Sequence, residues 1–174
     1  MAISNVMPAS SANTLSIVRR IDAPRAVVWR CWTQPELLKA WYCPKPWRVI
    51  EASLDLRPGG RSNTVFEGPN GERHDNNGIY LEIVPKERLV FTDAFTEGFL
   101  PKDGAPFMTG FVHLSDAPNG GTDMHWGARH WTAEDKAKHE AMGFEAGWSA
   151  AAAQLDELAQ RVAAGSAPGS AALA

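Results

Sequence analysis

The pattern of hydrophobic and polar residues near the N-terminus predicts one strand followed by two short helices. Apolar residues alternate imperfectly with polar ones along Thr14–Ile21, as in a strand with one buried face. Asp22 and Pro24 favour a helix start, because an aspartate accepts free backbone N–H groups there and proline is tolerated in the first turn. The spacing of residues 33–36 is typical of a capping box and predicts a second helix, separated from the first by Pro35.

The central part of the chain predicts an antiparallel sheet. Turn sequences such as Pro58-Gly59-Gly60 and Asn70-Gly71 separate apolar segments. The strands predicted in this part are residues 48–56, 61–67, 76–83, 88–95, 107–115 and 122–130. Strands joined by short turns pair as hairpins, so the sheet is expected to be antiparallel. Residues 96–106 contain two glycines and two prolines and are expected to form a longer loop, at a position where it could gate a cavity.

The C-terminal part predicts one long helix that begins after Thr132, with Asp135 three positions further on as its capping partner. Its apolar residues recur at helical spacing for about seven turns; they are Ala141, Phe144, Trp148, Ala151, Ala152, Leu155, Leu158 and Val162. Gly143 and Gly147 lower helix propensity by roughly 1 kcal/mol each relative to alanine. They share one face of the helix, where they either permit close backbone approach or leave room for a ligand.

Two stretches of sequence carry a family resemblance. The first reads APRAVVWRCWTQPELLKAWYCP and then WRVIEASLDLRPGG, between residues 23 and 60; the second is HEAMGFEAGWSAAAAQLDELAQRV, residues 139–162. Together they resemble the START-like (SRPBCC, helix-grip) superfamily. Within it they are similar to the branch related to the C-terminal domain of the activator of heat-shock protein 90 ATPase. The resemblance covers about residues 16–162.

The resemblance implies an α+β helix-grip fold like that of the birch pollen allergen. In this fold a curved antiparallel sheet of about seven strands wraps around a long C-terminal helix, two short helices follow the first strand, and a cavity usually lies between sheet and helix. The family's corner motif usually reads Trp-Trp-Gly-Pro. Here residues 41–44 read Trp-Tyr-Cys-Pro, which puts a thiol in place of a glycine.

Length and charge narrow the classes of function. A chain of 174 residues predicts a single domain, placed at residues 14–164, with a flexible N-terminus at 1–13 and a disordered tail at 165–174. The 17 basic against 20 acidic residues give a net charge of −3, which argues against nucleic acid or an anionic membrane as the main partner. We expect no membrane-spanning segment and no targeting segment, and both cysteines to be free thiols in a reducing cytoplasm.

The sequence offers weak candidates for chemistry, and no catalytic residue is assigned. Nucleotide-binding, nucleophile-elbow and zinc-protease motifs are missing, so we predict no cofactor and no metal. His113 and His125 are expected opposite or nearly opposite each other on two strands. His125 and His130 lie five apart, on opposite faces of a strand, which disfavours a shared metal. Cys43 has no histidine in the same element, which favours an unreactive, partly buried thiol over a nucleophile.

The inward faces of the strands predict a mostly apolar cavity with a few polar groups. The last strand places Met124, Trp126, Ala128 and His130 on one face, which the resemblance suggests is the inner one. An inward face with Ser62 and Thr64 would add hydroxyl groups. The cavity candidates are Phe66, Tyr80, Phe91, Phe111, Trp126, His130, Met142 and Trp148, and each fits a plain core residue equally well.

These observations favour a protein that binds a small hydrophobic or amphipathic molecule, such as a lipid, in the cavity. One alternative is a cyclase-like or hydrolase-like enzyme, with acid–base candidates Tyr80, Asp93, His113 and His130. Another is a stress-response co-chaperone that stimulates heat-shock protein 90. Only about 13 residues precede the first strand here, whereas complete activators carry a further N-terminal domain. A homodimer, paired through sheet edges or the Trp-rich corner, is a further expectation.

Overall fold

The computed structural model describes residues 12–165. Residues 1–11 and 166–174, which hold nearly all of the predicted flexible N-terminus and tail, lie outside the described part. Within it, Asn13 is fixed to the folded domain, because its carbonyl oxygen accepts a hydrogen bond from the backbone N–H of His130 at 3.0 Å. The predicted α+β helix-grip architecture is confirmed, with a large antiparallel sheet and a long C-terminal helix.

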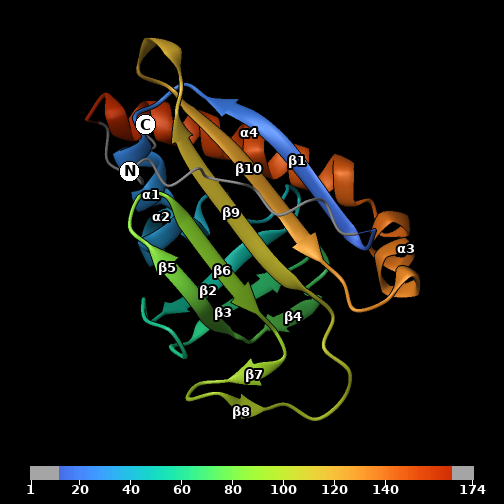
Figure 1. Ribbon diagram of the computed structural model, residues 1–174. Helices are drawn as coiled ribbons and strands as arrows, with labels where there is room; N and C mark the ends of the chain where they lie inside the picture. Colours follow the sequence, from blue (N-terminus) through green and yellow to red (C-terminus); the bar gives the residue numbers. More distant parts are fainter. Residues whose placement is uncertain (1–11, 166–174) are drawn as a thin grey trace.

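The main sheet contains five antiparallel strands in the order β1-β10-β9-β6-β5 (Figure 1). Their bounds are β1 Thr14–Ile21, β5 Ile79–Val84, β6 Arg88–Thr92, β9 Thr109–Asp116 and β10 Thr122–Arg129. A second sheet holds β2 Arg48–Leu54, β3 Ser62–Glu67 and β4 Arg73–Asn76. The two sheets meet where Arg61 bridges Ile79 and where Tyr80 exchanges backbone hydrogen bonds with Gly59 and Gly60.

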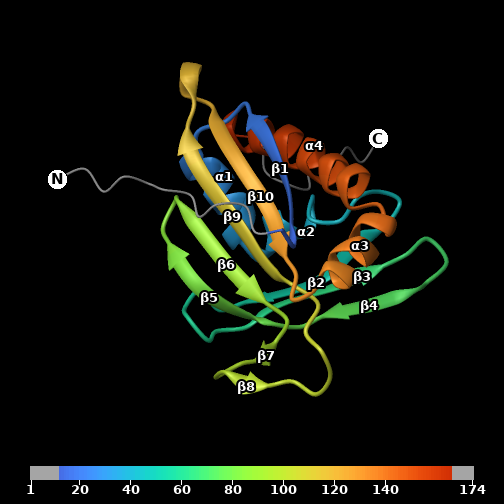
Figure 2. The ribbon, with the colours of Figure 1, turned by 45° about the vertical axis from the view of Figure 1, so that its right-hand side comes forward.

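The helices lie against one side of this curved surface. They are α1 Arg25–Thr33, α2 Pro35–Lys39, α3 Ala133–Ala141 and α4 Phe144–Ala163. Figure 1 shows α4 crossing behind β1 and β10, with α1 and α2 at one end and α3 at the other. The turned view of Figure 2 places α3 and the β3–β4 hairpin on the same side of the molecule.

The single long helix predicted from residue 132 onward is in fact two helices. Gly143 separates α3 from α4 and has φ of +88°, a conformation that glycine adopts without steric cost. The break turns Ala141 to solvent, so the prediction that this residue continues the buried stripe is wrong. Beyond the break the stripe is as predicted, and Ala151, Leu155 and Leu158 are almost fully buried against the sheet.

Of the helix caps predicted from the sequence, only the one at α3 is present. Thr132 Oγ1 accepts the backbone N–H of Asp135 at 3.0 Å, as predicted. The predicted cap by Asp22 is wrong, because α1 begins after Pro24 without a side-chain cap. The predicted capping box at α2 is also wrong: Thr33 Oγ1 instead donates to the carbonyl oxygen of Trp29 at 2.8 Å, one turn back in α1.

The strand β4 was not predicted because it lacks an apolar face. All four residues of β4 are exposed, so their sequence shows no alternation of buried and exposed positions. The predicted strand at residues 76–83 therefore begins only at Ile79. The predicted loop at 96–106 overlaps a small hairpin of β7 Phe95–Thr96 and β8 Leu100–Pro101.

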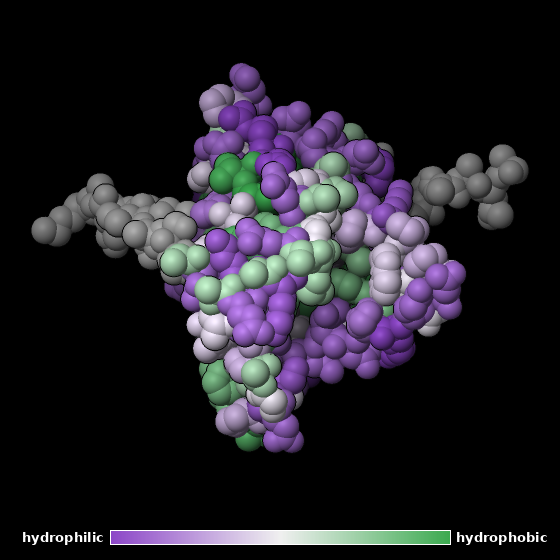
Figure 3. Space-filling model, turned by 90° about the vertical axis from the view of Figure 1, so that its right-hand side faces the viewer, coloured by the Kyte–Doolittle hydropathy of each residue, from purple (hydrophilic) through white to green (hydrophobic). Residues whose placement is uncertain are grey.

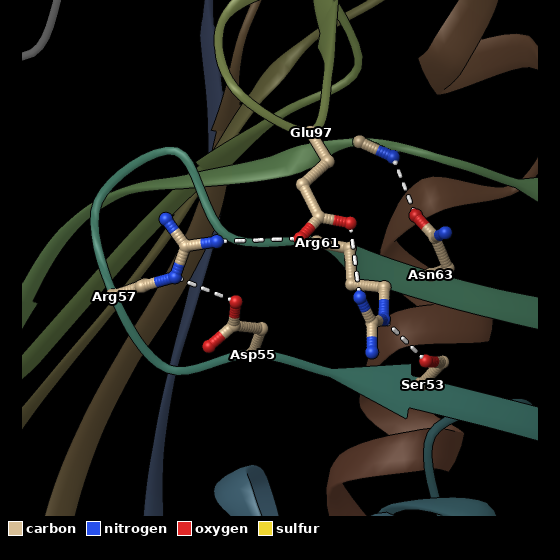
Figure 4. A network of polar contacts seen from close by, with 7 residues as sticks. Ser53, Asp55, Arg57, Arg61, Asn63 and Glu97 are labelled. Carbon is tan, nitrogen blue, oxygen red and sulfur yellow. Dashed lines mark hydrogen bonds and ion pairs between the residues drawn. The ribbon is translucent and has the colours of Figure 1, made fainter.

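A polar network fastens this small hairpin to the turn between β2 and β3 (Figure 4). Glu97 accepts from Arg57 at 3.3 Å and from Arg61 at 2.9 Å. Arg57 also donates to Asp55 at 2.7 Å, and Arg61 donates to Ser53 Oγ at 2.7 Å. Each exposed ion pair contributes little by itself, but the set holds the hairpin in one place.

The Trp-rich corner between α2 and β2 is fastened to α4 by one glutamine. Gln154 Nε2 donates to the carbonyl oxygens of Trp41 at 2.9 Å and Cys43 at 2.8 Å. Its Oε1 accepts the backbone N–H of Lys45 at 3.1 Å. The Trp41 ring is fully buried, and its indole N–H donates to the carbonyl oxygen of Cys31 at 2.9 Å. The corner thereby forms one wall of the space below α4.

Candidate ligand-binding cavity

A cavity of about 620 Å³ lies between the helices and the two sheets. Side chains from the corner, from β3, β4, β5, β6 and β10, and from α3 and α4 line it. Its size falls within the range of about 300–1,000 Å³ that is usual for small-molecule sites. Figure 3, which views the α3 side of the molecule, shows apolar surface recessed between hydrophilic side chains.

Aromatic rings form the inner wall of the cavity. Trp126 of β10 stacks on Trp148 of α4, with ring centroids 4.2 Å apart and an angle of 28° between the planes. Tyr42 lies on Trp126 at 6.0 Å in a second stacked pair. Trp32 of α1 meets Trp126 edge-on at 5.2 Å. Such a set of flat faces and edges suits a planar or chain-like apolar molecule.

Two indole N–H groups of this wall have no hydrogen-bond acceptor within residues 12–165. They belong to Trp32 and Trp126, whose side chains are 3% and 2% exposed and line the cavity. A buried donor without an acceptor costs about 1–3 kcal/mol. The wall is therefore mostly apolar but contains two hydrogen-bond donors that lack an acceptor.

Six of the eight predicted cavity residues line this space: Phe66, Tyr80, Phe91, Trp126, Met142 and Trp148. Met142 is 74% exposed, at the break between α3 and α4, and so belongs to the rim. Ser62 and Thr64 of β3 also line the cavity and add hydroxyl groups to its wall.

Phe111 lies on the opposite face of the sheet and outside the cavity, which corrects the expectation. Val112 pairs with the inward-facing Trp126, so the neighbouring residue on β9 must point outward. There Phe111 packs over Gly127 and under the guanidinium group of Arg129, 4.4 Å from the ring centroid. Phe111 is thus buried by neighbouring residues on the outer face of the sheet.

His130 also does not line the cavity but supports a residue that does. Its Nε2 lies 2.9 Å from Nδ1 of His139, and its Nδ1 lies 3.1 Å from the carbonyl oxygen of Asn13. His139 faces the cavity from α3 and contacts the rings of Phe107 and Phe144, each with centroids 5.0 Å away. Burial and the neighbouring His130 lower the pKa of His139 to about 4, so the ring is neutral at pH 7.

No pattern of residues marks His139 as a cavity residue. It lies nine positions after His130, across a turn and most of α3, and neither strand nor helix spacing relates the two. Trp32, Tyr42 and Phe107 were likewise missed, because they come from α1, the corner and the loop after β8. The crowding of tryptophan near residues 29–47 was the one available sign that this region forms a wall.

The acid–base candidates are not arranged as a catalytic pair. Both Asp93 carboxylate oxygens accept backbone N–H groups, from Phe107 at 2.8 Å and from Met108 at 3.1 Å, and so order the loop before β9. Burial raises the pKa of Tyr80 to about 12, which leaves its phenol protonated. His113 lies directly opposite His125 on the outer face of the sheet, as the turn predicted, and away from the cavity.

Neither cysteine is activated, and the described residues offer no metal centre. Burial raises the pKa values of Cys31 and Cys43 to about 11, so both thiols are protonated at neutral pH. Cys43 lines the cavity as a small apolar residue. Within residues 12–165 no group of three or more histidine, cysteine or carboxylate side chains is placed to hold a metal ion.

Comparison with known proteins identifies the family. The model described as "Activator of Hsp90 ATPase homolog 1-like protein" matches residues 22–160. The chain belongs to this family. Members of this family share the START-like fold, which agrees with the resemblance seen in the sequence. No curated protein sequence matches the chain.

Solved structures share the fold of this chain. A protein from Nitrosomonas europaea is 36% identical, with a TM-score of 0.85 over 89% of this chain and 99% of that one. A protein from Arthrobacter aurescens is 26% identical, with a TM-score of 0.74 over 86% and 87%. An AHSA1-like protein from Aeromonas hydrophila is 20% identical, with a TM-score of 0.65 over 86% and 93%, and shows the common fold. Among the described helices of this family member, none is long and apolar enough to cross a membrane.

Proposed function

We propose that this protein binds a small hydrophobic or amphipathic molecule in the cavity between α4 and the sheets. The observation that carries the proposal is the 620 Å³ space walled by stacked aromatic rings. Large rings usually fill a core, but here they surround a space open to solvent. Removing apolar ligand surface from water contributes roughly 25 cal/mol per Å², so even partial filling supports measurable affinity.

The polar groups of the wall support an amphipathic ligand over a pure hydrocarbon. The hydroxyl groups of Ser62 and Thr64 and the imidazole of His139 belong to residues that line the same space. A ligand oxygen or hydroxyl group would satisfy such groups, whereas a hydrocarbon would leave them unpaired. A few polar groups within an apolar wall are the usual arrangement that fixes a ligand's orientation.

Binding of the neutral dye N-phenylnaphthylamine tests the proposal, because its fluorescence rises in an apolar site. Gly147 lines the cavity, and the nearest atom to a Cβ added there is Cγ of Pro44, at 3.9 Å. Gly147→Leu should therefore fill the space and weaken dye binding about tenfold or more. Ala150→Leu is the matched control, since it adds the same side chain to an exposed position of α4.

Native mass spectrometry of the freshly purified protein complements the dye. A non-covalent adduct of a few hundred daltons that is lost on denaturation would identify the ligand class. Dye binding that Gly147→Leu and Ala150→Leu leave equally strong would place the dye elsewhere on the surface. No dye binding by the native protein at all would contradict the cavity proposal.

A further inference from the structure

The two histidines at the end of the cavity form a directed chain of hydrogen bonds. A carbonyl oxygen only accepts, so the contact of Asn13 with Nδ1 of His130 requires a proton on that nitrogen. When each of the two rings carries a single proton, Nε2 of His130 is left unprotonated and accepts from Nδ1 of His139 at 2.9 Å. His139 in turn carries its proton on Nδ1, and its Nε2 has a free lone pair.

That lone pair is the unused end of the chain. Nδ1 and Nε2 lie on different sides of the imidazole ring, and Nδ1 is turned toward His130. Within residues 12–165, the fully buried side-chain N and O atoms that lack a partner are the indole nitrogens of Trp32 and Trp126. Nε2 of His139 also lacks a partner there but is not among them, so solvent reaches it. His139 is 7% exposed and lines the cavity, so a ligand bound there would lie beside this ring.

The surroundings of His139 hold its ring in this orientation. The rings of Phe107, Phe144 and Trp148 lie around it, with centroids 5.0 to 5.6 Å away. An apolar surrounding disfavours the charged imidazolium, so the ring offers an acceptor and not a second donor. An anionic group would meet this lone pair with repulsion, and an ether would bring a second acceptor.

We infer that His139 Nε2 selects a ligand that carries a neutral hydroxyl group, which donates a hydrogen bond to this nitrogen while its apolar part lies against Trp126 and Trp148. The inference rests on the proposed cavity binding and adds the chemical class of the ligand's polar end. His130 acts as a positioning residue, because its contact with Asn13 fixes which nitrogen of His139 is unprotonated.

Competition with bound N-phenylnaphthylamine tests the inference with two probes that differ by one methyl group, naphthol and its methyl ether. The measured quantity is the ratio of the two affinities in each variant. His139→Asn preserves an N–H near Nδ1 for His130 but removes the acceptor at Nε2. The ratio should shift roughly fivefold against naphthol, the effect of one hydrogen bond. His139→Gln, whose amide oxygen reaches further, should restore part of the preference.

Two further variants separate positioning from mere structure. His130→Leu keeps His139 but removes the acceptor for its Nδ1, so the preference for naphthol should fall as well. His113→Asn makes the same kind of change on the outer face of the sheet and should leave the ratio unchanged. An unchanged ratio in folded His139→Asn, with dye still bound, would overturn the hydroxyl inference and leave cavity binding intact.

Nitrogen NMR of the native protein gives a result that needs no variant. A long-range proton–nitrogen spectrum distinguishes protonated from unprotonated imidazole nitrogens. We expect His139 with a protonated Nδ1 and an unprotonated Nε2, and a change at Nε2 when naphthol is added. A proton found on Nε2 of the free protein would overturn the inference. Absence of dye binding by the native protein would instead overturn the proposed function.

Discussion

Acidification should destabilise this protein through His139 in particular. The ring is buried, and its pKa is lowered from 6.5 to about 4 by burial and by His130. The unfolded chain therefore binds a proton at pH values where the folded chain does not. Stability contributed by the neutral ring is present above the unfolded pKa and is lost as pH falls toward about 4.

The size of this effect follows from the two pKa values. Between about pH 7 and about pH 5 a single group of this kind removes about 2 kcal/mol from the free energy of unfolding. With a urea dependence of about 2 kcal/mol per molar, the unfolding midpoint should drop by about 1 M. His139→Asn has no titrating ring at this position. Over the same pH interval, the decrease in its urea midpoint should therefore be about 1 M smaller than that of the wild type.

Urea unfolding followed by tryptophan fluorescence at both pH values measures the difference. His113→Asn serves as a comparison, because burial also lowers the pKa of His113 to about 4 but on the other face of the sheet. The two variants should each remove part of the pH dependence, and the double variant should remove both parts. Equal pH dependence in wild type and His139→Asn would refute the assignment of a buried neutral ring.

Three further predictions concern backbone and packing, and urea unfolding checks each. Gly147→Ala should stabilise the protein by up to about 1 kcal/mol, because alanine has the higher helix propensity. Gly143→Ala should destabilise it by about 1 kcal/mol, because φ at this residue is +88°. A stability change of the same sign in both variants would contradict the break between α3 and α4. Gln154→Ala should lower the free energy of unfolding by about 2 kcal/mol, because it removes three hydrogen bonds to the Trp-rich corner. An unchanged urea midpoint would show that the corner is stable without these bonds. Gly127→Ala should cost about 2 kcal/mol or more, because a Cβ there lies 2.5 Å from the Phe111 ring and 2.6 Å from a backbone oxygen; a midpoint equal to wild type would exclude this packing.

The fold was predictable where one pattern had one physical meaning. Short turns between apolar segments predicted hairpins, and β1 occupies the residues that the alternation marked. The prediction failed where the decisive interaction was not periodic. Gly143 reads equally well as a weak helix residue or as a break, and its positive φ appears only once α3 and α4 pack. Asp22 resembles a cap, but its backbone N–H is bound by Asp156 of α4 at 2.7 Å.

Most of the apolar residues that line the candidate site could be predicted, but the pair of histidines at its end could not. Phe66, Tyr80 and Trp126 were cavity candidates, with the inward face of Trp126 taken from the family resemblance, and all three line the cavity. Phe111 was misplaced because a one-residue uncertainty in register exchanges the two faces of a strand. His139 was missed because its partner is brought close by the turn after β10, which carries no residue pattern of its own. Pairings between distant segments are the part that local sequence does not encode.

The pairing of β1 with β10 also has a consequence for the order of events during synthesis. β1 is made before its partner strand β10, which follows roughly a hundred residues later. At about 5–20 residues per second, β1 waits on the order of several seconds before it can be paired. Throughout this interval its backbone groups are open to other chains, and such long-range pairing is intrinsically slow. Protection of β1 from association with other chains during this interval therefore favours the yield of folded protein.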